Sequence, residues 1–580
     1  MATKNNKSTR PTALRLPDVA HWRYGFVMLF VLAGVVVLTW RLLDLHVVDQ
    51  EFLRTQGDAR TVRVESIEAH RGMITDRNGE ALAVSTPVQT LWVNPAEMNL
   101  DDPRLGEVAS VLDLDLNGLL ARLAANSERQ FLYLKRKVQP SLARDVLSLK
   151  IPGVYARREY KRYYPAGEVA AHVVGFSNID EHGQEGVELA YNSWLSGEVG
   201  RKRVLRDRKG RLIKDLSLIA DAAPGKDVSL SIDLRLQYIA YRELKAAVRA
   251  HGADGGTLVM LDVHTGEILA MVNQTSYNPN NRERIDPADT RNRAITDLFE
   301  PGSTVKPLTI AAALESGRYA PETVVNTSPG YLRLNGYTIR DARDYGRLSL
   351  SEVVYRSSNV GTSRIAMDLT APVLVEMFSR VGFGQSVSIG FPGEGVGVLP
   401  VRSRWKDIEL ATLSYGYGLS VNALQLAQAY MVLANGGIRY PLSLVSLAEP
   451  PQGQRVLGEK VTAQVRQMLR QVVEKGTGKR AAMPIYTSAG KTGTVHLVGK
   501  GGYEDSQYKA VFAGMAPADS PRIVSVITID DPKGEEYYGG EVAAPIFARV
   551  MSDALRLLNV KPNIQPTVAG QAVNSGSGSG

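Results

Sequence analysis

The sequence predicts an α/β (α+β) fold for the larger, C-terminal part of the chain. Apolar runs typical of buried strands stand at 257–263 and 267–272 and return at 511–517 and 522–530. The sequence between these two groups is mostly helical. Strands at both ends of one stretch, with a helical block between them, predict a single sheet with helices on its faces.

Length and composition exclude several classes of function for this protein. The chain has 580 residues, too many for one compact core, and its 44% hydrophobic and 22% charged residues are typical of globular protein. The net charge of +8 is not gathered into a basic block, which argues against nucleic-acid binding. Cysteine is absent, which excludes disulfides, Cys-ligated zinc and cysteine nucleophiles. The eight histidines show no paired ligand spacing, so neither a metal nor a cofactor is expected.

A membrane anchor is predicted near the N-terminus. The uncharged run from Tyr24 to Trp40 spans about 25 Å as a helix, near the lower limit for crossing a bilayer. A buried core helix is the alternative, but the run is apolar on every face and no cleavage site follows it. Lys and Arg are in excess before the run. This predicts a cytoplasmic tail at 1–22, an anchor at 23–43 and export of everything that follows.

Residues 44–225 are predicted to form an extended, mixed α/β pedestal. Short strand-like runs and turns alternate there, a helical stretch at 104–125 interrupts them, and no catalytic side chains gather. Two of its arginines, Arg71 and Arg206, are interpreted either as contacts for partners or as ion-pairing residues that stabilise the fold.

Pro224-Gly225-Lys226 marks a boundary, after which 231–252 is predicted to be a long helix. The catalytic domain is placed at 226–563. Residues 564–580 are predicted to be a flexible tail that ends in an added Ser/Gly linker.

A nucleophile and its base are predicted at Ser303 and Lys306. Pro301-Gly302 supplies a turn, and a long apolar helix that ends at Gly317 follows. Ser303 therefore falls at a helix N-terminus, where free N–H groups favour developing negative charge. Lys306 stands three residues on, within reach of the hydroxyl. A lysine activates a serine only if burial or a nearby positive charge keeps its amine neutral.

The specific signal is an ordered set of three short motifs. Ser-x-x-Lys and Ser-x-Asn each occur several times in this chain and mean little alone. After Ser303, however, Ser357 and Asn359 form a Ser-x-Asn pair 54 residues on, and Lys491-Thr492-Gly493 follows ahead of strand sequence. At this point the chain resembles the penicillin-binding protein and serine β-lactamase superfamily.

The resemblance implies a fold and a set of roles. The domain would be an antiparallel sheet flanked by helices, with an all-helical insert. Ser303 would attack a D-Ala–D-Ala carbonyl, Lys306 would be the base, and Ser357 would pass a proton to the leaving nitrogen. Asn359 would hold the substrate amide. The substrate carboxylate would lie against the Lys491-Thr492-Gly493 strand with Thr492 and Thr494, and the oxyanion would lie between the N–H groups of Ser303 and Thr494.

Late tyrosines are candidates for a groove that binds the stem peptide, with ordinary packing as the open alternative: Tyr415, Tyr417, Tyr508, Tyr537 and Tyr538. The run 488–494 is also similar to the end of a nucleotide-binding loop. That reading fails because residue 485 would have to be glycine and is Ile485.

The exported part ahead of the catalytic domain resembles class B, high-molecular-weight penicillin-binding proteins. The similar segments are 71–85, 162–176, 183–188 and 206–212. TLWVNP at 90–95 is closer to the division-specific type, penicillin-binding protein three, than to the elongation type.

The resemblance implies a D,D-transpeptidase that crosslinks peptidoglycan at the septum, is a β-lactam target and is anchored in the inner membrane with its catalytic domain in the periplasm. Its implied partners are stem peptides, a membrane-embedded glycan polymerase of the SEDS type and other division proteins. An elongation enzyme, a D,D-carboxypeptidase or a β-lactamase-like hydrolase on the same fold stays open, because the motifs do not show which acceptor takes the acyl group. A non-catalytic β-lactam sensor is disfavoured, because the 22-residue tail leaves no room for an output domain.

Overall fold

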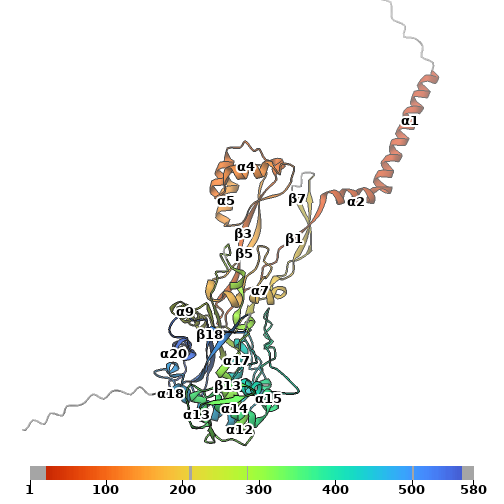
Figure 1. Cartoon of the computed structure of the whole chain (residues 1–580). Coiled ribbons are helices and arrows are strands. Elements are labelled where there is room, and N and C mark those ends of the chain that lie inside the picture. The colour runs from red at the N-terminus through yellow and green to blue at the C-terminus, as the bar shows by residue number, and fades with distance from the viewer. Residues whose placement is uncertain (1–20, 208–211, 284, 500–501, 565–580) are drawn as a thin grey trace, which may run out of the picture. The chain divides into compact units, whose positions relative to one another are not determined.

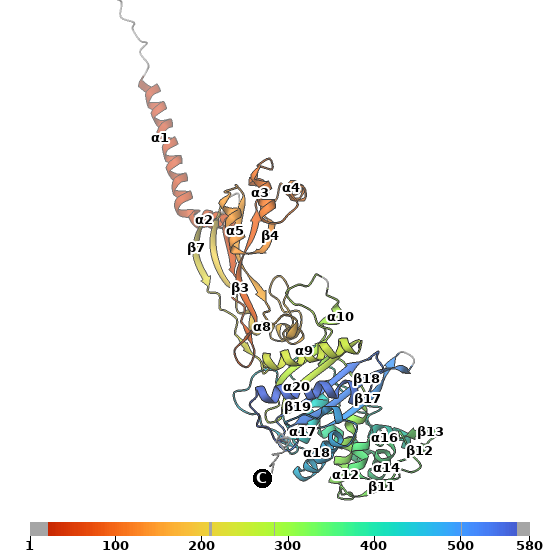
Figure 2. The same cartoon turned by 90° about the vertical axis from the view of Figure 1, so that its left-hand side faces the viewer.

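The computed structural model describes residues 21–207, 212–283, 285–499 and 502–564 (Figures 1 and 2). Apart from residues 21, 22 and 564, the tails predicted at 1–22 and 564–580 lie outside these ranges. Backbone contacts divide the chain into two compact units, Met1–Glu68 with Val199–Ala222, and Ala69–Glu198 with Ala223–Gly580.

The first unit joins helices to a small antiparallel sheet. It contains α1 (His21–Leu43), the π-helical turn η1 (Asp44–Val48), α2 (Gln50–Thr61), β1 (Val62–Ile67), β6 (Gly200–Arg206) and β7 (Leu212–Ala220). The strand order is β1-β6-β7, so β7 is an edge strand. The helix that runs through α1 and η1 is long and apolar enough to cross a membrane, and its side chains are not buried by the protein. This agrees with the predicted anchor.

The second unit begins with a sheet and the helices that cover it. The strand order is β4-β3-β2-β8, and β5 pairs with the other edge of β3. The strands are β2 (Ile74–Thr75), β3 (Ala81–Val93), β4 (Leu132–Val138), β5 (Val154–Tyr163) and β8 (Val228–Ser229). The helices are η2 (Pro95–Glu97), α3 (Arg104–Val111), α4 (Leu116–Ala124), α5 (Pro140–Ser148), η3 (Gly167–Val169), α6 (Ala171–Val174), α7 (Gly186–Ala190) and α8 (Asn192–Ser196).

The single helical stretch expected at 104–125 is two helices, α3 and α4. The chain breaks between them because Asp113 adopts a left-handed conformation, with φ of 51°. Asp115 then caps α4 by accepting a hydrogen bond from the N–H of Gly118 at 2.6 Å. Leucines and valines of α3, α4, β3 and β4 form one small core.

A buried ion-pair network ties the segments of this region together. Arg71, 1% exposed, donates to the carboxylate of Glu188 at 2.5 and 2.8 Å, and Arg162 donates to the same carboxylate at 2.6 Å. Arg71 also donates to Asn192 and Ser196. This placement supports the fold-stabilising interpretation of Arg71. Arg206 lies in the first unit, where its guanidinium pairs with Glu65.

The catalytic part is built on a five-stranded antiparallel sheet in the order β10-β9-β19-β18-β17, as expected. Its strands are β9 (Gly255–Asp262), β10 (Ile268–Gln274), β17 (Ala489–Gly499), β18 (Gly502–Ala516) and β19 (Ile523–Asp530). Early and late strands share one sheet, with β9 beside β19. The helix expected at 231–252 is α9 (Leu234–Ala250), which starts at Leu234 because the Asp233 side chain caps it.

The two faces of this sheet are covered by different helices. Leu258 and Met260 of β9 pack into a core with α9 and α20 (Ala544–Leu557), while Val259 and Leu261 enter the opposite core. This alternation follows the two-residue period of a strand. Figure 2 shows α9 and α20 together on one side of the sheet and α17, α18 and α12 on the other.

The stretch between β10 and β17 forms the expected mainly helical insert. Its helices are α10 (Pro287–Thr290), α11 (Arg293–Thr296), η4 (Gly302–Val305), α12 (Lys306–Glu315), α13 (Leu350–Arg356), α14 (Asn359–Leu369), α15 (Ala371–Arg380), α16 (Asp407–Ser414), α17 (Ala423–Ala434), α18 (Glu459–Glu474) and η5 (Lys479–Ala481). Its short strands are β11 (Val324–Asn326), β12 (Tyr331–Leu334), β13 (Tyr337–Arg340), β14 (Arg347–Ser349), β15 (Ile438–Arg439) and β16 (Gln454–Arg455). A short helix, α19 (Gly539–Val542), precedes α20.

Candidate active site

One cavity of about 500 Å³ brings together residues from all three sequence motifs. It is lined by Ser303, Ser357, Gly476, Thr477, Lys479, Arg480, Thr492, Thr494, Tyr538, Gly540 and Glu541. Ser303 comes from the turn before α12, Ser357 from the end of α13, and the two threonines from β17. Motifs far apart in the sequence therefore meet in one place.

Ser303 lies in a tight 3-10 turn, η4, and the α-helix proper begins at Lys306. Gly302 permits this turn, because its φ is +54° and a side chain there would come within 2.4 Å of Val495. The N–H of Gly302 donates to the carbonyl of Gly416 at 3.1 Å. Ser303 therefore lies in a 3-10 turn that leads into α12, where the sequence predicted the N-terminus of the α-helix itself. This turn packs against β17.

Lys306 is fully buried, and its ammonium nitrogen is directed at the second motif. Nζ donates to the carbonyl of Ser357 at 2.6 Å, to the hydroxyl of Ser357 at 3.1 Å and to Oδ1 of Asn359 at 2.7 Å. The spacing of Ser303 and Lys306 in the sequence predicts only that the two side chains lie near each other. The fold adds these contacts, which join the first motif to the second.

Ser357 and Asn359 flank the break between α13 and α14. Ser357 has left-handed backbone angles, φ 59° and ψ 42°, which are uncommon for a residue other than glycine, asparagine or aspartate. Asn359 is the first residue of α14, and its Nδ2 donates to the carbonyl of Arg340 at 3.0 Å. The side-chain amide of Asn359 is therefore held at both of its ends by protein groups.

Asp341, a residue that the sequence motifs do not include, fixes this break. Its carboxylate accepts from the N–H of Asn359 at 2.6 Å, from the N–H of Val360 at 3.0 Å and from the hydroxyl of Ser358 at 2.5 Å. An acidic group at the start of α14 accepts hydrogen bonds from the free N–H groups of the first turn. Its negative charge also interacts favourably with the positive end of the helix dipole. No sequence signal links it to Asn359, because β13 delivers it from outside the helix.

Lys491 reaches the same hydroxyl from β17. Its buried Nζ donates to the hydroxyl of Ser357 and to the carbonyl of Thr492, each at 3.0 Å. Thr492 and Thr477 share a hydrogen bond of 2.7 Å between their hydroxyls. The hydroxyl of Thr494 accepts from the N–H of Gly539 at 3.0 Å. Thr477 is a second residue that sequence spacing did not reveal.

Burial sets the proton affinities of the two lysines. Loss of water lowers the pKa of Lys306 well below 10.5, the charge of Lys491 lowers it further, and the carboxylate of Asp341 acts in the opposite direction. Burial also lowers the pKa of Lys491, to about 7. The lowered pKa of Lys306 favours its neutral amine, the form that can accept a proton.

Gly493 lies where β17 passes closest to the nucleophile turn. A side chain at this position would come within 3.0 Å of the Thr304 methyl group and 3.2 Å of the carbonyl of Pro301. Glycine therefore allows β17 and the turn that carries Ser303 to approach each other.

The predicted tyrosines form two groups. Tyr508 stacks on Tyr537 with ring centroids 4.6 Å apart, and Tyr537 contacts Tyr538, a residue of the cavity wall, at 4.4 Å. Tyr415 and Tyr417 pair edge to face at 5.7 Å, and Nζ of Lys306 lies 5.9 Å from the Tyr415 ring centre. The cavity lining includes only Tyr538 of the five.

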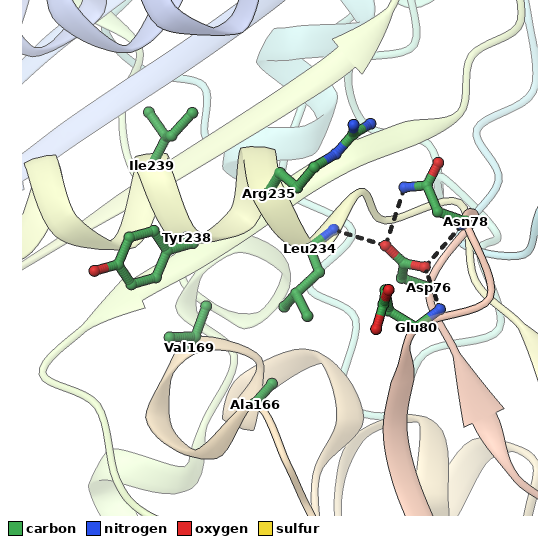
Figure 3. A pocket seen from close by; sticks show the side chains of 9 residues that line it. All are labelled: Asp76, Asn78, Glu80, Ala166, Val169, Leu234, Arg235, Tyr238 and Ile239. Carbon is green, nitrogen blue, oxygen red and sulfur yellow. Dashed lines mark hydrogen bonds between the residues drawn. The ribbon is translucent and has the colours of Figure 1, made fainter. Parts of the chain in front are cut away.

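A further cavity, of about 680 Å³, contains none of the motif residues. It lies between the β2–β3 turn, η3 and the start of α9 (Figure 3). The carboxylate of Asp76 joins the β2–β3 turn to α9, because it accepts from the N–H groups of Asn78, Glu80 and Leu234 at 2.8 to 3.0 Å. The walls are mainly apolar, and nothing there resembles the chemistry around Ser303.

Comparisons with known proteins agree with this geometry. Residues 256–552 match the family model described as the penicillin binding protein transpeptidase domain. Residues 66–230 match the penicillin-binding protein dimerisation domain. Among curated proteins, the chain is 44% identical to the probable peptidoglycan D,D-transpeptidase PbpC of Pseudomonas aeruginosa, over 94% of this chain and 97% of that one. It is 42% identical to the peptidoglycan D,D-transpeptidase FtsI of Escherichia coli, over 96% of each.

Solved structures support the same assignment. Penicillin binding protein 3 from Mycobacterium tuberculosis, complexed with aztreonam, aligns with a TM-score of 0.68 at 28% identity over 87% of this chain and 99% of that one. The transpeptidase domain of Burkholderia pseudomallei penicillin-binding protein 3 aligns with a TM-score of 0.54 at 41% identity over 58% and 98%. The chain therefore belongs to the penicillin-binding proteins, as a class B member of the FtsI or penicillin-binding protein 3 type.

Proposed function

We propose that this protein is a membrane-anchored serine D,D-transpeptidase that crosslinks peptidoglycan stem peptides at the division septum and is a target of β-lactams. The observation that carries the proposal is the convergence of two buried lysine amines on one serine hydroxyl, in the cavity that also exposes Ser303. The names of the relatives, peptidoglycan D,D-transpeptidases, support the reaction.

The first step is acylation of Ser303. Its Oγ attacks the carbonyl carbon of the penultimate D-Ala, and its proton passes to the neutral amine of Lys306. The backbone N–H groups of Ser303 and Thr494 are the proposed donors to the oxyanion. The low pKa of Lys306 supports its role as the base, because a protonated amine has no lone pair to accept the proton.

Expulsion of the terminal D-Ala needs a proton on its nitrogen, and Ser357 is the proposed donor. Its Oγ already accepts from both Lys306 and Lys491, so its own O–H proton is free to be donated into the cavity. As the C–N bond breaks, that proton moves to the leaving nitrogen and Ser357 takes a proton back from Lys306. The result is an ester on Ser303 and free D-Ala.

An acceptor amine from a second stem peptide completes the cycle. It attacks the ester carbonyl and loses a proton to Lys306 by way of Ser357. Lys306 passes that proton to Oγ of Ser303 as the ester C–O bond breaks, which restores the hydroxyl. Asn359 is proposed to hold the substrate amide, with Lys491, Thr492, Gly493 and Thr494 at the carboxylate. The tyrosines at 415, 417, 508, 537 and 538 are proposed as groove residues, a role that the position of Tyr538 in the wall supports.

The proposed organisation is a cytoplasmic tail at 1–22, an inner-membrane anchor at 23–43, a periplasmic pedestal at 44–225, a transpeptidase domain at 226–563 and a tail at 564–580. The partners would be a membrane-embedded glycan polymerase of the SEDS type and other division proteins. The edge strand β7 supports contact with partners, because Ile213, Leu216 and Leu218 along it are 45–60% exposed.

The decisive experiment gives the purified full chain a donor peptide ending in D-Ala–D-Ala together with an acceptor amine. Mass spectrometry then separates exchange or crosslinking from hydrolysis. Crosslinked product together with a penicillin adduct on Ser303 supports the transpeptidase. Hydrolysis alone would favour the carboxypeptidase or β-lactamase alternative. Depletion in cells that blocks the septum, rather than elongation, supports the division role.

A further inference from the structure

The helix that follows the membrane anchor, α2 (Gln50–Thr61), is amphipathic. One face, by the spacing i, i+3, i+4 and i+7, carries Phe52, Thr55, Gln56 and Ala59. A different face carries the charged residues Glu51, Arg54 and Asp58. Phe52 is thus the bulkiest group on a face without a charge, and the charges stand together on another side.

The apolar side chains of this region are not covered by the protein. Phe52 is 62% exposed, and Val47 and Val48 just before it are 69% and 73% exposed. These values continue those of α1, whose apolar side chains are exposed along its whole length. Exposed apolar side chains therefore continue past the end of α1, through Val47 and Val48, to Phe52 of α2.

A bend keeps this surface close to the end of the anchor. If α1 and α2 formed one straight helix, Phe52 would lie about 18 Å beyond Trp40, past an interfacial layer only about 5–8 Å thick. The chain instead passes through the π-helical turn η1, where the N–H of Asp49 donates to the carbonyl of Asp44 at 2.8 Å. Figure 1 shows α2 turning away from the axis of α1 at this point.

We propose that α2 is an interfacial helix. Its Phe52 face lies in the headgroup region of the membrane that α1 spans, on the side of the exported domain, and its Glu51–Arg54–Asp58 face is in water. The partner of this surface is the lipid bilayer itself. An exposed aromatic on an uncharged face, next to a spanning helix, fits the energetics of a helix lying in the interface. The inference rests on the proposed anchoring through α1.

The test uses the absence of cysteine, which makes single-site labelling clean. Full-length Phe52→Cys, Gln56→Cys, Ala59→Cys, Arg54→Cys and Asp58→Cys variants carry a nitroxide and are reconstituted in vesicles of phosphatidylethanolamine and phosphatidylglycerol. Collision of the label with dissolved oxygen, which enters lipid, is compared with collision with a water-soluble nickel chelate. Penicillin acylation of each variant shows that it is folded, because none of these residues contacts the active site.

We expect the ratio of oxygen to nickel collisions to be at least severalfold higher at positions 52, 56 and 59 than at 54 and 58. Equal ratios on both faces would overturn the proposal. Shielding of positions 52, 56 and 59 from both reagents would also overturn it, since it would mean that protein covers the face. A label at Val36→Cys, in the middle of α1, tests the anchoring separately: a lipid-type ratio there with a water-type ratio at Phe52 refutes the interfacial helix alone.

Discussion

Lys306 and Lys491 share one acceptor: each donates through Nζ to the hydroxyl of Ser357, over 3.1 and 3.0 Å. Both amines are fully buried, so lost hydration disfavours the charge of each, and the charge of Lys491 lowers the pKa of Lys306 further. The hydrogen bond between Lys306 and Ser357 therefore links the proposed proton acceptor for Ser303, which is Lys306, to the proposed proton donor for the leaving group, which is Ser357.

Replacing Lys306 by arginine should remove the base while retaining a positive charge. We expect acylation of Ser303 by a labelled penicillin to fall by about 100-fold or more, because a guanidinium has no neutral form near pH 7. Stopped-flow or gel-based acylation rates measure the effect. Lys475→Arg, at an exposed position after α18, serves as the matched control. Acylation at the wild-type rate in Lys306→Arg would exclude Lys306 as the base.

Asp341→Asn should loosen the break between α13 and α14. The variant loses the negative charge of the carboxylate that accepts hydrogen bonds from Asn359, Val360 and Ser358. We expect acylation to fall about tenfold or more, in line with about 1.5–3 kcal/mol for hydrogen bonds to a charged group. Because Asp341 raises the pKa of Lys306, its loss should also shift the acidic limb of the acylation profile to lower pH.

Asp344→Asn is the control for this experiment. Asp344 follows the same β13 strand but bonds to Ser328 and Gly346, away from Asn359. A fall in melting temperature with an unchanged pH profile in Asp341→Asn would mean that this aspartate only stabilises the fold.

The buried Lys491 should make stability depend on alkaline pH. Its pKa is about 7 in the folded chain against 10.5 for an ordinary lysine. Between these values the unfolded state binds a proton that the folded state lacks, so unfolding free energy should rise with pH across this window. The slope from one such group is at most about 1.4 kcal/mol per pH unit. Lys306 contributes with the same sign.

Melting temperatures of the wild type and Lys491→Met between pH 7 and 10 check this prediction. The variant should lose part of the upward slope, because methionine carries no proton in either state. A wild-type stability that falls steadily from pH 7 to 10, by the same amount in both proteins, would contradict it.

Arg71 and Arg206 should respond differently to alanine. Arg71→Ala leaves Glu188 buried with only one arginine, and breaking such a network costs about 3–5 kcal/mol. Arg206→Ala removes a partly exposed ion pair with Glu65, of the kind worth about 1 kcal/mol or less. Thermal melting separates them. An unchanged melting temperature in Arg71→Ala together with lost division activity would instead support a docking role.

The sequence by itself determined the sheet and its helical insert. Strand-type runs at 257–263 and 522–530 are mainly apolar, as is typical of strands covered on both faces, and they pair as β9 and β19. The uncharged run from Tyr24 to Trp40 determined the candidate membrane helix in the same way. The three motifs could be found because their residue types and their order in the chain match those of the superfamily that the sequence resembles.

Only the tertiary structure decided which groups meet. Asp341 contacts Asn359 across a chain reversal that no periodicity records, and Thr477 contacts Thr492 from a loop after α18. Arg71 proved to be core because Glu188, 117 residues away, meets it in the fold. Local patterns reflect the geometry of one helix or strand, whereas burial and proton affinity depend on neighbours that are distant in sequence. That is why Lys306 could be nominated as a base from the sequence, while the reason for its low pKa required the fold.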